Sequence, residues 1–466
     1  MLFTDWRGDP DELLDGVDTA VADVLCRACA RGVRVLGLIW RSHPDRTKFS
    51  EEENRNLAAE VNAAGGEVRL DERVRRAGSH HQKLFVVLHE ADPSRDVAFV
   101  GGIDLCHGRN DDERHCGDPQ RVVMDPRFGP TPAWHDVQAE IRGPAIADLV
   151  ETFRERWSDP SPLRRTAFGH RRDGGGREHD NAVPRRTRNA TPAAGDNAVQ
   201  VLRTYPARRH GYPFAPRGER SIALAYLKAF RRARRLIYIE DQYLWSRDAA
   251  AALARALHDH PLLRLVVVVP RFPDEDGRVT GPPNRLGQLG VIRQLRAIGG
   301  PRVAVYDLET ERFPIYVHAK VCIIDDVWMT IGSDNLNRRS WTHDSELSCA
   351  ILDQRRDDRV PTDPAGLGDG ARVSARSTRL SLWGEHLQIA DVPVDPDEGF
   401  DMLRTSADRL DRWHAQCRPD PRPAGRLRHH VPEPVGAAER FGASLMNRLV
   451  NDPDGRPLSL RLRRSF

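Results

Sequence analysis

The chain has 466 residues, which is enough for two or three domains with substantial hydrophobic cores. Hydrophobic residues make up 39% of the chain and charged residues 30%, the balance of an ordinary globular protein. A formal net charge of only +3 excludes a strongly basic chain that would bind nucleic acid through bulk charge. The chain contains no apolar run long enough to span a membrane, and residues 1–14 lack the pattern of a signal peptide.

Helical and strand patterns alternate through the first half of the chain. Apolar residues at helical spacing predict helices over residues 11–31, 51–64 and 145–157. Runs of branched apolar residues predict strands over residues 33–40, 82–88 and 97–100. Residues 158–199 are rich in arginine, glycine, proline and asparagine and have no apolar periodicity, which indicates a linker or a long surface loop.

The second half has the same alternation. The predicted helices cover residues 219–235, 247–258 and 286–298. The predicted strands cover residues 236–240, 262–270, 303–306, 321–325 and 327–331. Residues 351–466 form a tail in which residues 378–388 and 399–416 have helical spacing, and we expect this tail to pack on the second half. Repeated alternation of this kind indicates an α/β fold with sheets flanked by helices.

The two halves also match each other in the same order. Residues 30–40 match 260–270, His81-Gln-Lys83 matches His318-Ala-Lys320, and residues 101–104 match 332–335. The sequence therefore predicts an internal duplication. A helix and a strand precede residues 241–245 in the second half, whereas the corresponding residues 3–6 lie almost at Met1. We expect the first half to lack its opening helix and most of its first strand, and we interpret the given start as lying downstream of the natural one.

The strongest motif lies in the second half. It reads His318-x-Lys320-x4-Asp325-x6-Gly332-Ser333-x-Asn335, and Glu346 follows it. His318 and Lys320 are two residues apart, so they share one face of a strand. Lysine can bind a phosphate oxygen, and histidine can attack phosphorus or transfer a proton near neutral pH. The turn at Ser333 and the amide of Asn335 can bind the same anion, while Glu346 can hold an imidazole in one tautomer.

The first half repeats this motif with one departure. Spacing selects His81 rather than His80 as the reactive histidine, and Lys83, Gly102 and Asp104 complete the repeat. Leu88 stands where the pattern requires aspartate, and Asp92 or Asp96 could compensate. The spacing that leads to Glu346 leads here only to His115, with acidic residues at 111–113, so the carboxylate partner of the first half stays open.

Three further features bear on the site. Only four of the 71 basic residues are lysine, and two of these four lie in the His-x-Lys triplets, which indicates a requirement for a compact ammonium group. Glu240 follows a buried strand and is expected at the mouth of the cleft. Trp134-His135-Asp136 suggests a histidine–aspartate pair, but adjacent strand residues point to opposite faces, which favours a structural role.

The paired motifs resemble the phospholipase D superfamily, whose signature is H-x-K-x4-D-x6-G-[GS]. Longer matches to the phospholipase D proper branch cover residues 99–106, 134–144, 153–157, 219–222, 237–244 and 381–387. The resemblance implies two similar lobes, each a mixed β-sheet flanked by helices, related by pseudo-twofold symmetry with the active site at their interface. The expected lobes are residues 1–157 and 200–350, joined by 158–199 and followed by an extension over 351–466.

The resemblance also implies a function, namely hydrolysis or alcohol exchange of glycerophospholipids through a phosphohistidine, without a metal ion or cofactor. His81 would be the nucleophile and His318 the acid. The remaining implied roles are catalytic for Lys83, Lys320 and Asp325, substrate-binding for Gly102, Asp104, Ser333 and Asn335, and supporting for Glu346 and Glu240. We expect a monomer in the cytoplasm or at the membrane periphery, with a phospholipid at a membrane surface as its partner and no nucleic-acid partner.

Two alternatives stay open at this point. One is an enzyme that exchanges phosphatidyl groups, as cardiolipin synthases do, although those usually carry membrane helices near the N-terminus. The other, from a different class, is a degenerate, non-catalytic phospholipid-binding protein, for which Leu88 is the sequence support. A nuclease is less favoured because the sequence has no basic stripe.

Overall fold

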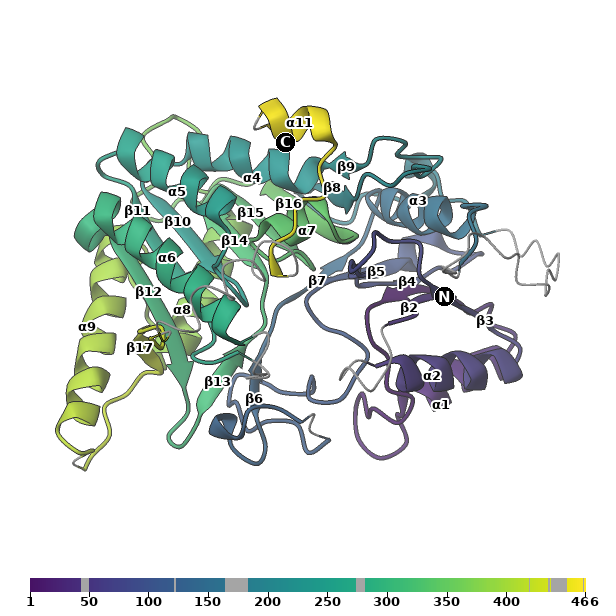
Figure 1. Ribbon diagram of the computed structural model, residues 1–466, viewed down its shortest axis with the longest axis horizontal. Coiled ribbons are helices and arrows are strands. Elements are labelled where there is room, and N and C mark those ends of the chain that lie inside the picture. Colours follow the sequence, from purple (N-terminus) through teal and green to yellow (C-terminus); the bar gives the residue numbers. More distant parts are fainter. Residues whose placement is uncertain are drawn as a thin grey trace.

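The computed structural model of the protein describes residues 1–42, 50–120, 123–163, 183–273, 281–418, 420–434, 436, 451–463 and 465–466. Much of the predicted linker, residues 164–182, lies outside these described residues. Two mixed β-sheets flanked by helices dominate the fold, the first drawn in purple and blue and the second mainly in teal and green (Figure 1). The α/β fold with two lobes is therefore confirmed.

The first sheet has six strands. Their order is β3 (Glu67–Asp71), β2 (Leu36–Trp40), β1 (Leu2–Asp5), β4 (Leu84–Val87), β5 (Val97–Gly101) and β7 (Gln138–Ile141). The first three strands run parallel and the later pairings are antiparallel. Helices α1 (Val21–Ala30) and α2 (Glu51–Ala63) pack on one face, and α3 (Ile146–Trp157) packs on the other.

The second sheet repeats this plan. Its central order is β12 (Val303–Glu309), β11 (Arg264–Val268), β10 (Leu236–Glu240), β14 (Val321–Ile324), β15 (Trp328–Gly332) and β16 (Glu346–Asp353). Parallel and antiparallel pairings follow in the same sequence as in the first sheet. The two halves of the chain therefore form two copies of one topology, as the matching sequence blocks predict.

Additional strands extend the second sheet. They are β13 (Pro314–Val317) with β6 (Ala133–His135) at one end, β8 (Asn197–Tyr205) with β9 (Glu219–Arg220) at the other, and β17 (Leu427–His429) beside β12. Strand β6 comes from the first half of the chain and pairs in parallel with β13. The first half thus contributes β6 to the second sheet, and β6 is called the exchanged strand below.

Helices cover both faces of the second sheet (Figure 1). Those on one face are α4 (Ser221–Arg232), α5 (Arg247–Asp259) and α6 (Gly281–Gly299). Those on the other are α8 (Val373–Leu387) and α9 (Pro396–Ala415). Two short helices complete the set, α7 (Arg338–Thr342), which packs against α4 and α5, and α11 (Leu458–Arg463) near the C-terminus. Within the described part of the chain, no helix is both long enough and apolar enough to cross a membrane.

The structure differs from the sequence prediction at the start of the chain. Leu2–Asp5 forms β1 and pairs with both β2 and β4, so the prediction that most of the first strand is missing is wrong. The helix predicted from residue 11 begins only at Val21. Gly16 adopts a positive φ of 77°, and Thr19 Oγ1 donates to the Gly16 carbonyl, so a turn occupies this stretch.

One hydrophobic core joins the two lobes. It includes Leu84 and Val86 of β4 together with Val321 and Ile323 of β14, all almost fully buried. Strand β5 of the first sheet lies against β15 and β16 of the second. The ends of β4 and β14 are thereby held close together, which is where the two His-x-Lys motifs lie.

Candidate active site

Each His-x-Lys motif lies immediately before a central strand and beside a segment of the other half. Lys83 precedes β4 and Lys320 precedes β14. The His81 N–H donates to the Ser345 carbonyl at 2.9 Å, and the His318 N–H donates to the His135 carbonyl at 2.8 Å. Backbone hydrogen bonds therefore fix each motif against the opposite half.

The histidine of the first motif is held by a carboxylate of the second half. His81 Nδ1 lies 2.9 Å from Glu346 Oε2, and the same oxygen accepts a 2.6 Å hydrogen bond from Ser333 Oγ. Burial and the nearby Lys83 ammonium hold the pKa of His81 well below its usual range. Burial, together with the charge of Asp344, holds the pKa of Glu346 well above its usual range. Both groups of this pair therefore favour their neutral forms.

The histidine of the second motif has the reciprocal arrangement. His318 Nδ1 lies 2.7 Å from Asp136 Oδ2, and Asp136 follows the exchanged strand β6. Burial and the Lys320 ammonium lower the pKa of His318 to about 3. Burial pushes the pKa of Asp136 upward, but His318 and Lys320 outweigh it, and that pKa falls below its usual range. Asp136 is thus the first-half carboxylate that the sequence could not place.

The two motif lysines differ in their partners. Lys83 Nζ forms a buried ion pair with Asp104 Oδ1 at 3.0 Å. Asp5 lies beside this pair, and its backbone hydrogen bonds come from Trp6 and Leu105. Burial and the neighbouring Asp104 charge raise the pKa of Asp5 well above its usual range. One lysine, one ionised aspartate and one neutral carboxyl group thus fill the first-half side of the site.

Lys320 has no such partner. Among the described residues, no carboxylate lies within ion-pairing distance of its ammonium, which donates instead to the His318 carbonyl. Asn335 occupies the position that Asp104 has in the first half. Burial and the charge of Lys83 outweigh the nearby carboxylates and lower the pKa of Lys320 to about 8. This buried cation is therefore available to an incoming anion.

The predicted turn residues line the same cluster. A Cβ atom at Gly102 would lie 2.1 Å from Asp136 Oδ1, so this position requires glycine. Ser333 contacts Glu346 as described, and Asn335 Oδ1 is buried without a hydrogen-bond partner within the described part of the chain. Gly102 therefore lies against the carboxylate that holds His318, and Ser333 against the carboxylate that holds His81.

Aromatic rings flank the histidines, and the sequence did not single them out for this role. The ring centroids of Trp6 and His81 are 6.1 Å apart, and those of Trp134 and His318 are 4.9 Å apart. The Arg109 guanidinium stacks on Trp134 at 3.9 Å and lies 3.5 Å from Asp104 Oδ2. These flat rings restrict the imidazoles from the sides and complete a compact site.

Two predicted site residues lie elsewhere. Asp325 follows β14, whereas Lys320 precedes it, so the strand separates them. The Asp325 carboxylate accepts 2.8 Å hydrogen bonds from the backbone N–H groups of residues 234, 235 and 236, which lead into β10. Glu240 is fully buried and binds His135 and His386 instead of the reactive histidines. The structure brings neither carboxylate into contact with the His-Lys cluster.

Leu88 occupies the position in the first half that corresponds to Asp325 in the second half. Leu88 follows β4 as Asp325 follows β14, and it packs against the shared core. Asp96, one of the two proposed substitutes, accepts a 2.6 Å hydrogen bond from the His89 N–H and pairs with Arg186 at 2.7 Å. The departure from the motif therefore lies at the end of the strand remote from Lys83.

A duplicated α/β fold whose paired His-x-Lys motifs meet at the lobe interface defines the structural class, and comparisons with known proteins give the family. The family model described as "Phospholipase D" matches residues 13–252 and 298–419. The chain belongs to the phospholipase D family.

Curated relatives include two Arabidopsis thaliana proteins. Phospholipase D gamma 3 is 26% identical over 84% of this chain, and phospholipase D alpha 1 is 27% identical over 81% of it. In each case the chain spans 59% of the length of the relative. Among solved structures, phosphatidylserine synthase from Haemophilus influenzae superposes with a TM-score of 0.49 and 14% identity, covering 76% of this chain and 77% of that one.

Proposed function

We propose that this protein is a phospholipase D-type phosphodiesterase that acts on glycerophospholipids such as phosphatidylcholine or phosphatidylethanolamine at a membrane surface. The observation that carries the proposal is the reciprocal pairing of His81 with Glu346 and of His318 with Asp136. In each pair the carboxylate engages Nδ1, so Nε2 is the ring atom left for chemistry. The names of the sequence relatives support a phospholipid as the substrate.

The substrate phosphate would be bound first by Lys320. This ammonium is buried without a carboxylate partner among the described residues, so an anion relieves its desolvation, whereas Lys83 already has Asp104. The bound anion would also offset the two positive charges that lower the pKa of each histidine. Substrate binding thereby raises the histidine pKa values toward the range in which proton transfer is efficient.

The reaction would then proceed in two displacements. In the first, His81 Nε2 forms a bond to phosphorus while the bond from phosphorus to the leaving alcohol breaks, and the alcohol oxygen takes a proton from His318 Nε2. In the second, His318 takes a proton from water, whose oxygen attacks phosphorus as the bond from phosphorus to nitrogen breaks. The products are phosphatidate and the free alcohol, and both histidines return to their starting forms.

Asp136 would stabilise the imidazolium form of His318 that this cycle requires. Its pKa lies below the usual range, so it is ionised at neutral pH and accepts the Nδ1 proton. Lys83, Lys320 and the amide of Asn335 would stabilise charge on the non-bridging oxygens. This division of labour assigns attack to His81 and proton transfer to His318.

Bis(p-nitrophenyl) phosphate tests this assignment, because p-nitrophenolate leaves without needing a proton. His318→Ala should release about one p-nitrophenol per chain in a burst and then stop, since the phosphohistidine forms but is not hydrolysed. His81→Ala should give no burst. A burst from His81→Ala and none from His318→Ala would reverse the roles, and no turnover by the wild type on this ester or on phospholipids would contradict the proposed activity.

A further inference from the structure

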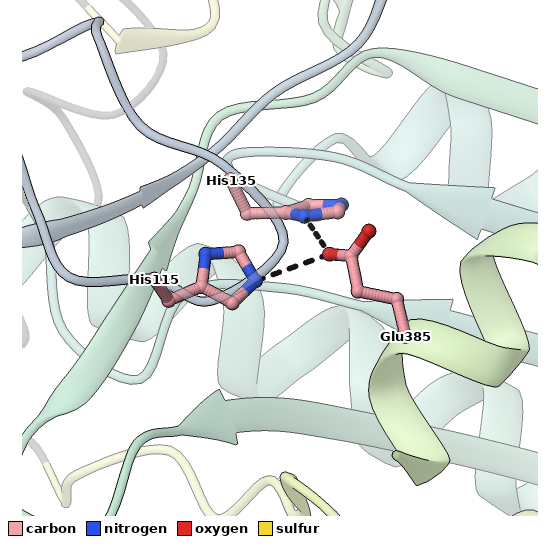
Figure 2. Close-up of side chains that lie close together, drawn as sticks. All are labelled: His115, His135 and Glu385. Carbon is pink, nitrogen blue, oxygen red and sulfur yellow. Dashed lines mark hydrogen bonds and ion pairs between the residues drawn. The ribbon is translucent and has the colours of Figure 1, made fainter. Parts of the chain in front are cut away.

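A second cluster of histidines and glutamates lies behind the active site. His135 precedes Asp136 at the end of β6, so the two side chains point to opposite faces of the strand. His135 Nδ1 lies 2.9 Å from Glu385 Oε1, and His115 Nε2 lies 3.1 Å from the same oxygen. Figure 2 shows both rings directed at this carboxylate, which projects from α8. Three segments distant in sequence therefore converge on one point.

The outer nitrogens of both rings are also engaged, and only by acceptors. His115 Nδ1 lies 3.1 Å from the Trp134 carbonyl oxygen, which can only accept a hydrogen bond. His135 Nε2 lies 2.8 Å from Glu240 Oε2. If each ring is neutral, its single proton lies on this outer nitrogen. The inner nitrogens, His115 Nε2 and His135 Nδ1, then direct lone pairs at the Glu385 oxygen.

Three converging lone pairs repel one another unless a positive charge lies between them. A proton on Glu385 would satisfy only one of the two inner nitrogens. Satisfying both with protons requires both rings to be charged at once. Burial lowers the pKa of His135, but Glu240 and Glu385 outweigh it and raise that pKa well above its usual range. A second positive charge on His115 would also have to be buried, because His115 has only 5% relative exposure. One divalent cation supplies the same two positive charges as those two protons and accepts all three lone pairs.

We propose that His115, His135 and Glu385 form a binding site for a divalent transition-metal ion of the Zn²⁺ type. Two histidines and one glutamate are a recognised zinc ligand set, which leaves a fourth position open. Metal–ligand bonds of about 2.1 Å place tetrahedral ligand atoms about 3.4 Å apart. Two of the three separations are 2.9 and 3.1 Å, and all three ligand atoms lie within 4.8 Å of one another.

The surroundings have the features that a metal site needs. Histidine ligands usually donate their other ring N–H to a carboxylate or a backbone carbonyl, and the outer contacts to Glu240 and Trp134 fit both forms. Glu240 is held in turn by His386 Nε2 at 2.8 Å. His115 also lines a surface pocket of ≈ 410 Å³, which gives an ion a route to the cluster.

The site would position the catalytic machinery without touching substrate. The carbonyl of His135 accepts the N–H groups of His318 and Ala319, and the next residue, Asp136, binds the His318 ring. An ion that fixes the His135 side chain to α8 therefore also fixes the backbone that holds His318. None of the residues assigned to the proposed reaction, namely His81, Lys83, His318, Lys320, Asn335 and their carboxylate partners, belongs to this site, so the proposed chemistry needs no metal ion.

Zinc binding to the purified full chain tests the proposal without any activity assay. The metal-free wild type should take up one Zn²⁺ per chain with a dissociation constant below about 1 μM, measured by competition with a chromogenic chelator. His115→Gln or Glu385→Gln should weaken this binding at least 100-fold, and Glu240→Gln should weaken it about 10- to 100-fold, the usual range for partners of ligands. Zn²⁺ should raise the Tm of the wild type but not that of His115→Gln.

Control variants separate this site from adventitious binding. His258, which is exposed, and Cys116, which lines the same pocket, serve as matched controls, and His258→Gln and Cys116→Ser should bind Zn²⁺ like the wild type. The metal-free Tm of His115→Gln should equal that of the metal-free wild type, which excludes misfolding. No stoichiometric binding by the wild type, unchanged binding by His115→Gln, or loss of binding in Cys116→Ser would each overturn the proposal.

Discussion

His81 Nδ1 and Glu346 Oε2 are 2.9 Å apart although the two residues are separated by 265 positions in the chain. The pairing is reciprocal, because the first half returns Asp136 to His318 across the same interface. Each motif histidine therefore takes its carboxylate partner from the other half of the chain. The duplication produced one site that depends on both lobes, and the exchanged strand β6 is the element that delivers Asp136.

Asp136 and Glu346 should respond differently to substitution by the corresponding amide residue. Asp136 has a pKa below its usual range and is needed as an anion, so Asp136→Asn should lower kcat by about 10²- to 10⁴-fold. Glu346 has a raised pKa, so its neutral form resembles glutamine, and Glu346→Gln should cost about tenfold or less. Steady-state kinetics on both variants measures the difference. A larger loss in Glu346→Gln than in Asp136→Asn would contradict the assigned charge states.

The two lysines should differ in their effect on stability. Lys320 is a buried cation without a carboxylate partner among the described residues, so Lys320→Met should raise the free energy of unfolding by about 1–3 kcal/mol while abolishing activity. Lys83→Met should lower it by about 1–3 kcal/mol, because the buried Asp104 loses its closest partner and keeps only the 3.5 Å contact with Arg109. Urea denaturation of both variants provides the comparison, and equal shifts of the same sign would refute it.

Asp325 should behave as a structural residue. Its carboxylate accepts hydrogen bonds from the backbone N–H groups that lead into β10. Asp325 and Lys320 lie at opposite ends of β14. Asp325→Asn keeps one acceptor oxygen, so it should lower the free energy of unfolding by about 1–3 kcal/mol and leave kcat of the folded protein within about twofold. Its kcat should be compared with that of Asp136→Asn at a temperature where both are folded. A 100-fold loss of kcat in Asp325→Asn would restore the catalytic role that the motif implies.

Much of the fold was accessible from the sequence because local patterns determine it. The strand at Leu236–Glu240 and the helix Glu51–Ala63 follow the predicted ranges closely, and the matching sequence blocks correspond to matching strands. Some missed strands, such as β6 with three residues, are too short for a periodic signal and form only through tertiary pairing. Length does not explain β8 and β16, which have nine and eight residues and were also missed. Strand exchange between the lobes leaves no local pattern at all.

The site was predictable in its reactive residues but not in its pairings. Spacing and residue chemistry identified His81, Lys83, His318 and Lys320, which the structure brings together. The contact of Asp136 with His318 could not be predicted, because the sequence places only His135 beside Asp136 and His318 lies in the other half of the chain. Glu240 ends a buried strand, but its side chain is fully buried and contacts the second cluster, so the prediction that it lies at the mouth of the cleft is wrong. Long-range contacts of this kind require the fold.

The stability of the protein should fall with acid partly because of His318. Its pKa in the folded protein is about 3, below the value of about 6.5 in an unfolded chain, so the neutral ring is favoured by folding. This contribution is present above pH 6.5 and is lost as the pH falls from 6.5 toward 3, because only the unfolded chain takes up the proton. The loss should be about 3 kcal/mol between pH 6.5 and pH 4.

The variant His318→Gln isolates this contribution. It removes the titrating ring, so its free energy of unfolding should decline less steeply than that of the wild type between pH 6.5 and pH 4. Other buried histidines titrate in both proteins and cancel in the comparison. Urea denaturation at several pH values measures the two slopes, and identical slopes would show that His318 is already protonated in the fold.

The most direct test of the account is release of choline and ethanolamine from mixed phospholipid vesicles by the wild type, His81→Ala and His318→Ala. Asp325→Asn serves as a control that is altered outside the site. We expect release by the wild type and by Asp325→Asn. The release rate should fall at least 1,000-fold in each histidine variant, because both halves supply one shared site. Release near the wild-type rate by either histidine variant would contradict a single site built from His81 and His318.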